Sequence, residues 1–256
     1  MTEFAPIDAG VVSRLASDIE SNGYAVVQNF FSPEQLELAR EYIRSETSKH
    51  HQEYFSIHGV EAMEGSLLAN LSASTTFRQF LADLYEKATG AQPSNAERIF
   101  PVIRCLQGKS GLKESHFYHF DATAVTALAP VFIPTEGEHC GDLIMFPNMR
   151  PLRSSAVVNI MEKAILHNTL SQKLTAMAVK RGVLKPITIK LVPGNLYLFW
   201  GYRSLHSNDQ CNPEHLRATG LYHFGNPHRD SSLARIFLGK NKRKAKLNHD
   251  GLRPQA

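Results

Sequence analysis

The first third of the chain has apolar side chains at helical spacing, interrupted by one run of β-forming residues. Between Val11 and Ile19 apolar positions recur every three or four residues, which predicts a helix with one buried face, and Asn22-Gly23 ends it. Residues 24–30 are rich in β-branched and aromatic side chains and predict a short strand. We therefore expect this part of the chain to be mostly helical.

Two further helices carry recognisable start signals. Ser32, Pro33 and Gln35 supply a capping hydroxyl, a proline at the first helical position and the glutamine that completes a capping box. A later helix is expected to begin near Ser74 and to end at Gly90, because glycine commonly follows the last turn of a helix.

From about residue 97 the pattern changes to short β-forming runs separated by glycine, proline or polar turns. Between these runs residues 157–181 are expected to form a helix in which Leu174 and Met177 are buried. Helices followed by many short strands are typical of a β-sandwich or an open barrel with helices packed outside it. The predicted strands are 99–106, 115–121, 125–133, 142–146, 186–192, 196–200 and 217–224.

Length and composition are those of an ordinary globular protein. The chain has 256 residues, of which 43% are hydrophobic and 20% charged, so it can bury a large core as one generous domain. The N-terminus resembles no signal peptide and no stretch is long enough to cross a bilayer, which predicts a cytoplasmic protein without a membrane partner. Three widely spaced cysteines indicate thiols in a reducing compartment, not a disulfide framework.

The net charge of +4 can be attributed largely to a basic run between Lys240 and Lys246. Such a run can bind nucleic acid, but no aromatic residue is interleaved to stack on bases, and charged chain ends are commonly solvated. We therefore expect no nucleic-acid partner. The absence of GxGxxG and GxxxxGK also gives no support to a dinucleotide fold or a P-loop.

The candidate chemistry centres on HFD at 119–121 and a distant histidine. Side chains alternate along a strand with a period of two, so His119 and Asp121 would project from the same face. His206, in PGNLYLFWGYRSLHSN, is the natural third ligand from another strand. Two imidazoles and one carboxylate suit Fe(II) and leave coordination positions open for a chelating cosubstrate and for O2.

A second alternating run begins at Arg217, and it places Arg217, Thr219 and His223 on one face. An arginine fork pairs with a carboxylate through two charge-assisted hydrogen bonds, and a threonine hydroxyl can add a third. Arg217 and Thr219 are therefore candidates to anchor the distal carboxylate of 2-oxoglutarate while its keto-acid end chelates iron.

These residues lie in segments that resemble the Fe(II)/2-oxoglutarate-dependent oxygenases, and within them the phytanoyl-CoA dioxygenase-like group. NGYAVVQNFFSPEQLELAR is similar to the opening strand and capped helix of that group, HFD to its metal dyad, and PGNLYLFWGYRSLHSN with HLRATG to its distal ligand and cosubstrate arginine. The resemblance implies a double-stranded β-helix, which is a jelly-roll or cupin-like barrel. It also implies iron on His119, Asp121 and His206, with 2-oxoglutarate on Arg217 and Thr219.

The implied reaction is the oxidative decarboxylation of 2-oxoglutarate to succinate and CO2, coupled to hydroxylation of an unactivated C–H bond in a small-molecule substrate. In related halogenases a halide replaces the carboxylate ligand, so Asp121 favours hydroxylation over chlorination, while desaturation depends on substrate pose. GEHCGDLIMFPN is followed by a predicted helix, which departs from the group and argues against transferring its substrate residues, and acyl-CoA in particular.

The sequence carries weaker signals for the residues that contact the substrate. Arg104, Lys109, Lys113 and His223 fall near the expected barrel mouth and are candidates to contact the substrate, which the cations would suit if it carried an anionic group. Two alternatives stay open: a cupin-type iron oxygenase that does not use 2-oxoglutarate, and a non-catalytic jelly-roll binding protein. Substrate identity and oligomeric state are left open.

The expected organisation is a single oxygenase domain over residues 1–256. Residues 1–95 would form a mostly helical part packed on the barrel, and residues 96–239 the jelly-roll core with a helical insert at about 157–181. Residues 240–256 would form a basic C-terminal tail.

Overall fold

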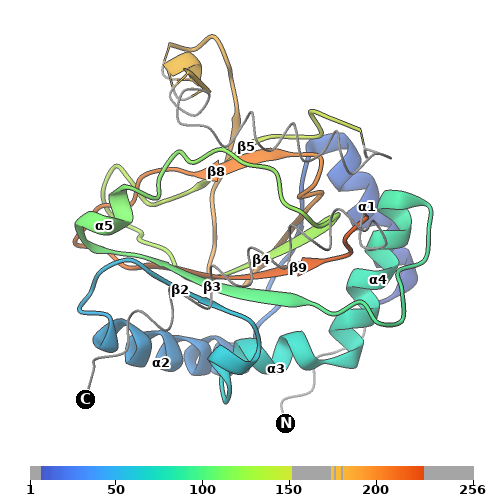
Figure 1. Cartoon of the computed structure of the whole chain (residues 1–256), viewed down its shortest axis with the longest axis horizontal. Helices are drawn as coiled ribbons and strands as arrows, with labels where there is room; N and C mark the ends of the chain where they lie inside the picture. The colour runs from blue at the N-terminus through green and yellow to red at the C-terminus, as the bar shows by residue number, and fades with distance from the viewer. Residues whose placement is uncertain (1–6, 152–173, 176, 180, 228–256) are drawn as a thin grey trace, which may run out of the picture.

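The computed structural model describes residues 7–151, 174–175, 177–179 and 181–227. Two antiparallel sheets lie one above the other, and the helices pack outside the larger sheet and at the two ends of the pair (Figure 1). The larger sheet has six strands in the order β1-β7-β4-β9-β3-β2, and the smaller has three in the order β6-β5-β8. Mainly antiparallel sheet with flanking helices is the architecture expected from the sequence.

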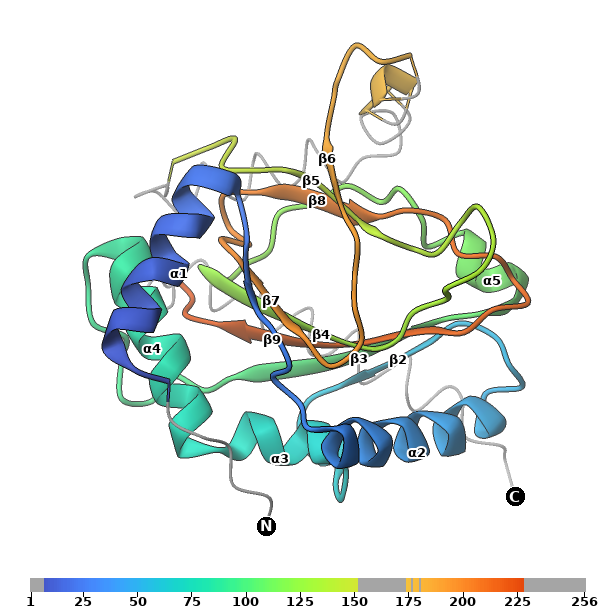
Figure 2. The ribbon, with the colours of Figure 1, turned by 180° about the vertical axis from the view of Figure 1, so that it is seen from behind.

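Most strands come from the second half of the described chain, as the short β-forming runs predict. Every pair of neighbours in the larger sheet except β3 and β2 is non-consecutive, so its order depends mainly on contacts between segments far apart in the chain. Figure 2 shows the reverse side, where β6 and β7 are visible. The strands are β1 Ala25–Val27, β2 Phe55–His58, β3 Phe100–Leu106, β4 Val125–Phe132, β5 Leu143–Phe146, β6 Ile187–Ile189, β7 Leu196–Phe199, β8 Leu205–Asn208 and β9 Arg217–Phe224.

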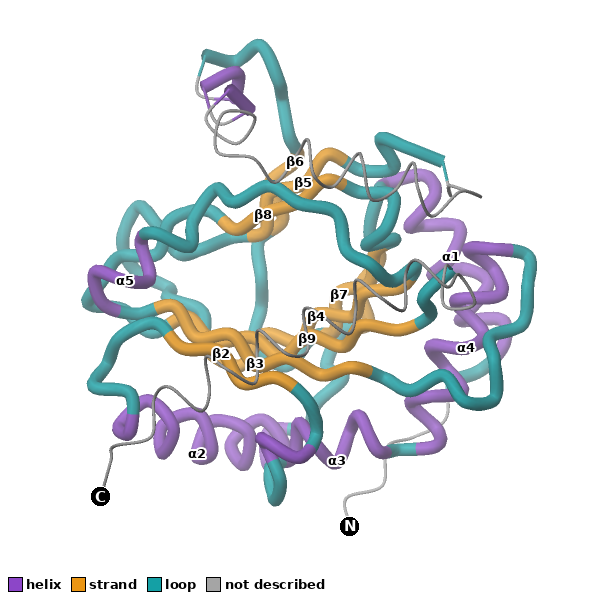
Figure 3. The backbone as a smooth tube through the Cα atoms, viewed as in Figure 1, coloured by secondary structure: helices purple, strands orange, loops and turns teal. Residues whose placement is uncertain are grey.

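The helices cover the outer face of the larger sheet with their apolar stripes. Figure 3 shows α2 and α3 below that sheet, with α1 and α4 at one end and α5 at the other. Buried residues of α1 and α4 join the same core cluster as the helix-facing residues of β3, β4 and β7. The helices are α1 Ala9–Asn22, α2 Pro33–Lys49, η1 Glu61–Met63, α3 Leu67–Ala73, α4 Thr75–Thr89 and α5 Gly108–Leu112. Within the described residues, none is long and apolar enough to span a bilayer.

The predicted helix ends agree with the structure. Gly23 and Gly90 cap α1 and α4 in the left-handed conformation that glycine adopts without a steric penalty. Ser32 and Gln35 form the expected capping box at the start of α2, because each side chain bonds the backbone of the other residue. These signals are local, so the sequence alone could reveal them.

Several expectations differ from the structure. Residues 115–121 were expected to form a strand, but His116 has a positive φ of 58° and only His119 makes a bridge, so the segment is irregular. The expected buried positions Leu174 and Met177 are 55% and 46% exposed. The predicted ranges include neither β2 nor helix α3, and they omit β8, although His206 is expected to come from a strand. Most of the predicted helix at 157–181, and the whole basic tail at 240–256, lie outside the described residues.

The capping box gives a first test of the N-terminal packing. Ser32→Ala removes the hydroxyl that accepts from the backbone N–H of Gln35. We expect the free energy of unfolding to fall by about 1 kcal/mol, measured as a lower urea midpoint with an unchanged slope. Ser48→Ala is the matched control, because its exposed hydroxyl donates within a helix already formed. An equal loss in both variants would contradict a specific role for the cap.

Candidate metal centre and its pocket

The two candidate histidine ligands are direct backbone partners. The His119 N–H donates to the His206 carbonyl at 3.0 Å, and the His206 N–H returns the bond at 3.0 Å. Residues that exchange both bonds across an antiparallel bridge carry their side chains on the same side. The two imidazole centroids accordingly lie 4.4 Å apart. One isolated bridge therefore brings together two residues that are distant in the sequence.

A backbone carbonyl two residues earlier orients each imidazole. Nδ1 of His119 lies 3.0 Å from the carbonyl oxygen of Phe117, and Nδ1 of His206 lies 3.0 Å from that of Ser204. A carbonyl oxygen can only accept, so Nδ1 carries the proton and Nε2 presents its lone pair. Each Nε2 lies 3.6 Å from a carboxylate oxygen of Asp121. The free lone pairs and the carboxylate therefore converge.

Asp121 is held from several directions. Its backbone N–H donates to the Gly201 carbonyl at 2.9 Å, and the Thr126 hydroxyl donates to Oδ2 at 2.5 Å. His223 Nδ1 lies 3.6 Å from the same oxygen. Burial by itself raises the pKa of Asp121, but the surrounding histidines and the Thr126 hydroxyl together hold that pKa below its ordinary value. The carboxylate is therefore ionised at neutral pH.

His119, Asp121 and His206 together form a donor set that fits a metal ion. Their ligand atoms all lie within 4.8 Å of one another, and no other such group of His, Cys, Asp or Glu side chains occurs among the described residues. Burial, assisted by the neighbouring His206, lowers the pKa of His119 to about 3. The ring is therefore in the neutral form that binds metals. Two imidazole nitrogens and one carboxylate are a ligand set suited to Fe(II).

A cavity of about 270 Å³ adjoins these three side chains, and residues of both sheets line it. Four alternate residues of β9 contribute to its wall: Arg217, Thr219, Leu221 and His223. The period of two that the sequence predicts for this strand therefore places Arg217 and Thr219 in the same pocket as the three candidate ligands.

Arg217 forms a fixed positive charge in the wall of the cavity. It is only 3% exposed, its Nε donates to the Gly141 carbonyl at 2.6 Å, and its Nη1 lies 3.5 Å from the Thr219 hydroxyl. Burial, with the nearby Arg104, lowers the pKa of Arg217 to about 10, so the guanidinium stays protonated at neutral pH. No carboxylate in the described part of the chain forms an ion pair with it. A buried cation of this kind suits an anionic ligand.

Of the four residues expected to contact the substrate, two line the cavity and two do not. Arg104 and His223 line the cavity, whereas Lys109 and Lys113, which lie at α5, do not. Arg104 Nη2 donates to the Glu114 carboxylate at 3.1 Å, so this cation is already paired. Its buried Nε has no hydrogen-bond partner among the described residues.

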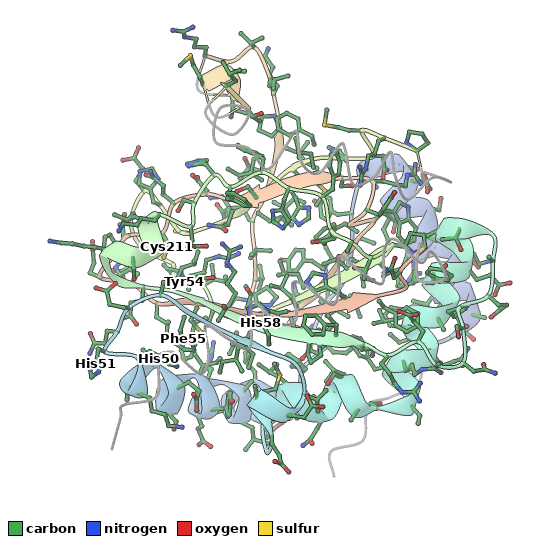
Figure 4. The ribbon with its side chains drawn as sticks, viewed as in Figure 1. His50, His51, Tyr54, Phe55, His58 and Cys211 are labelled. Atoms are coloured by element: carbon green, nitrogen blue, oxygen red, sulfur yellow. The ribbon has the colours of Figure 1, made fainter. Side chains whose placement is uncertain are left out.

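Sequence reasoning missed one wall of the cavity. Tyr54, Ser56 and His58 line it from β2 and the residue before that strand, and Tyr54 and His58 are labelled in Figure 4. They alternate with Phe55 and Ile57, which are buried in the core. This alternation of polar and apolar residues is typical of a strand, but the run is too short to predict one from the sequence alone.

Gly201 contacts the candidate ligand Asp121 so closely that only glycine fits. A Cβ built on Gly201 would overlap the Thr126 hydroxyl and the Oδ2 of Asp121, and would lie 2.9 Å from the Cβ of Asp121. The Gly201 carbonyl also accepts the hydrogen bond from the backbone N–H of Asp121. The position is therefore constrained by packing around the carboxylate.

Comparisons with known proteins place the fold. No family model matches the chain, and no curated protein matches it by sequence. Solved structures similar to this one include a prolyl hydroxylase from Trichoplax adhaerens in complex with a peptide fragment of the hypoxia inducible factor oxygen degradation domain. That structure has a TM-score of 0.58 and 12% identity, over 88% of this chain and 93% of the other.

Two further solved structures are also similar to this one. The non-heme α-ketoglutarate-dependent carbocyclase SnoK from nogalamycin biosynthesis matches with a TM-score of 0.56 and 13% identity, over 90% of this chain and 93% of its own. EctD from S. alaskensis with bound Fe matches with a TM-score of 0.54 and 17% identity, over 88% and 79%. At these identities the likeness establishes the fold, which is one that Fe/2-oxoglutarate oxygenases adopt.

The Gly201 contact generates a test of the metal centre. In Gly201→Ala the added methyl group must displace the Asp121 carboxylate. We expect overpacking to cost about 1–3 kcal/mol of stability and the affinity for Fe(II) or Co(II), measured anaerobically by calorimetry, to fall at least about tenfold. Gly111→Ala is the matched control, since its Cβ would meet only ordinary contacts of 3.4 Å or more. Unchanged metal affinity in folded Gly201→Ala would contradict the assignment.

Proposed function

We propose that the protein is an Fe(II)- and 2-oxoglutarate-dependent dioxygenase that hydroxylates an unactivated C–H bond of a small molecule and releases succinate and CO2. The observation that carries the proposal is one cavity lined both by a convergent His119, Asp121 and His206 set and by the buried cation Arg217. Metal ligands alone suit many reactions. An unpaired arginine beside them selects a cosubstrate that chelates the metal and also carries a distal carboxylate.

In this proposal each residue has a defined task. The two imidazoles and Asp121 would bind iron on one side, which leaves the opposite positions open. Arg217 and Thr219 would bind the distal carboxylate of 2-oxoglutarate. Bound Fe(II) would use O2 and 2-oxoglutarate to supply the oxidant for the C–H bond. The remaining walls of the cavity orient the substrate and exclude water from the reaction.

We also propose a fold type and a closer family relationship for the protein. The two stacked antiparallel sheets support a double-stranded β-helix in a single oxygenase domain, with residues 1–95 packed against it. The segment resemblance supports a phytanoyl-CoA dioxygenase-like relationship, and the low identities of the similar structures leave that as a sequence argument. A cupin-type iron oxygenase without 2-oxoglutarate, or a non-catalytic binding protein, would make Arg217 dispensable for cosubstrate binding.

Substitution of Arg217 distinguishes the 2-oxoglutarate-dependent reaction from the two alternative functions. Truncating one partner of a buried charge pair leaves the other unpaired, so we expect Arg217→Ala to weaken 2-oxoglutarate binding to the Fe(II) protein at least about 30-fold. Anaerobic calorimetry measures this, and succinate formation should fall with it. Arg217→Lys should recover only part of the affinity, because it keeps the charge and loses the fork.

Two controls accompany the Arg217 variants. Metal affinity should stay within about twofold of wild type, since Arg217 forms hydrogen bonds with Gly141 and Thr219 and with none of the three candidate ligands. Undiminished 2-oxoglutarate binding in Arg217→Ala, or no succinate from the wild-type protein with any candidate substrate, would reject the proposed function. Oxygen consumption without 2-oxoglutarate would instead favour the cupin-type reaction.

The substrate is proposed to meet the wall formed by β2 and β3. Ser56 and His58 offer polar groups there, and their side chains are 2.9 Å apart. Burial lowers the pKa of His58, so this wall carries a neutral imidazole. Arg104 provides the charged element, and its buried unpaired Nε could donate to an oxygen of the substrate. A small molecule with a carboxylate or phosphate group fits this wall.

Ligand screening can test the role of Arg104. Small molecules with an anionic group should raise the melting temperature of the protein loaded with Fe(II) and 2-oxoglutarate, because ligands stabilise the folded state that binds them. Arg104→Gln should remove that rise. Arg203→Gln is the matched control, since Arg203 pairs with Glu20 away from the cavity lining. Loss of the rise in both variants, or in neither, would argue against Arg104.

A further inference from the structure

Cys140 and Cys211 face each other across an isolated antiparallel bridge outside the candidate metal centre. The residue after each cysteine donates a backbone hydrogen bond to the residue before the other, at 2.7 and 3.1 Å. The cysteines therefore occupy a non-hydrogen-bonded position, in which Cα atoms lie about 4.5 Å apart and the side chains share one face. The bridge continues the register in which Leu143 of β5 pairs with Asn208 of β8.

The surroundings of this cysteine pair leave both sulfur atoms available to each other. Both are free thiols, with Cys211 buried and Cys140 partly exposed. Each Sγ makes only long contacts with backbone carbonyl oxygens, at 3.7 to 3.9 Å. Disulfides span Cα separations of about 4.4–6.8 Å, so the separation typical of this bridge falls inside the permitted range. Figure 4 shows Cys211 near the α5 end of the molecule.

We propose that Cys140 and Cys211 are a site of reversible disulfide formation, with hydrogen peroxide as the oxidant. The partly exposed Cys140 would lose its proton and attack one peroxide oxygen as a thiolate, which breaks the O–O bond and gives a sulfenic acid and hydroxide; the hydroxide takes up the released proton and becomes water. The Cys211 sulfur would then displace the hydroxyl from Cys140 and give up its proton to it, forming the S–S bond and a second water. Two thiols lose two electrons in total, and one peroxide is reduced to two waters.

The disulfide would act on the neighbouring binding site. Gly141 follows Cys140 directly, and its carbonyl accepts the hydrogen bond from Arg217 Nε at 2.6 Å. A Cβ on Gly141 would collide with the Arg217 side chain, so the backbone and the guanidinium are in close contact. A cross-link at Cys140 would fasten this backbone in the position that holds Arg217. Only this last consequence rests on the proposed function.

The test uses the full chain without metal or cosubstrate, so that its outcome is independent of the proposed reaction. Of the three cysteines, all should react with a thiol reagent in denaturant before treatment, and one should react after treatment with dilute hydrogen peroxide. Peptide mapping should find Cys140 linked to Cys211, and dithiothreitol should restore all thiols. The melting temperature of the oxidised protein should rise by several degrees, because a disulfide between Cys140 and Cys211 closes a long loop of the chain.

Variants identify the site. Cys105→Ala should still lose two thiols and give the same linked peptides, since Cys105 is buried in β3 with no bridge to another cysteine. Cys140→Ser and Cys211→Ser should each give no linked peptides and no rise in melting temperature. Three unreacted thiols in the wild type, oxidation of Cys140 alone to a sulfinic acid, or links only between molecules would overturn the proposal.

Discussion

The bridge between His119 and His206 is the constraint on which the candidate site depends. Imidazole nitrogens must converge to within a few ångströms to hold one ion, and here two exchanged backbone hydrogen bonds set that approach. The backbone carbonyls of Phe117 and Ser204 then fix the ring orientations. The site is therefore positioned mainly by main-chain bonds. Side-chain packing enters at Asp121, where the absence of a side chain at Gly201 leaves room for the carboxylate.

The charges of the pocket form a second constraint. Asp121 accepts the Thr126 hydroxyl and has three histidine rings beside it, whereas Arg217 is buried with only a carbonyl and a hydroxyl as partners. The two positive charges of Fe(II) and the one of Arg217 would balance the single charge of Asp121 and the two of 2-oxoglutarate. Burying charges is costly unless they are compensated. Metal and cosubstrate together would therefore leave the pocket close to neutral.

Local signals were readable from the sequence, and long-range pairings were not. The capping box at Ser32, the glycine stops and the alternation of β9 from Arg217 each depend on neighbours within a few residues. The segment around His119 was predicted as a strand, yet tertiary contacts with β8 hold it in an irregular path with His116 at positive φ. His119 and Asp121 still lie together, because the bridge to His206 fixes the backbone at His119 and the Gly201 carbonyl accepts the backbone N–H of Asp121.

The substrate wall and the cysteine pair show the same limit. β2, a short strand at the edge of the larger sheet, brings His58 to the cavity wall through its pairing with β3, and no spacing in the sequence pairs Cys140 with Cys211. One ladder nevertheless connects the two ends of the site. The pairing of β5 with β8 carries His206 at one place and, continued in the same register, Gly141 beside the cysteines. The candidate metal ligand His206 and the backbone that supports Arg217 therefore belong to one continuous ladder of antiparallel pairs, so a change in the position of β5 relative to β8 would affect both.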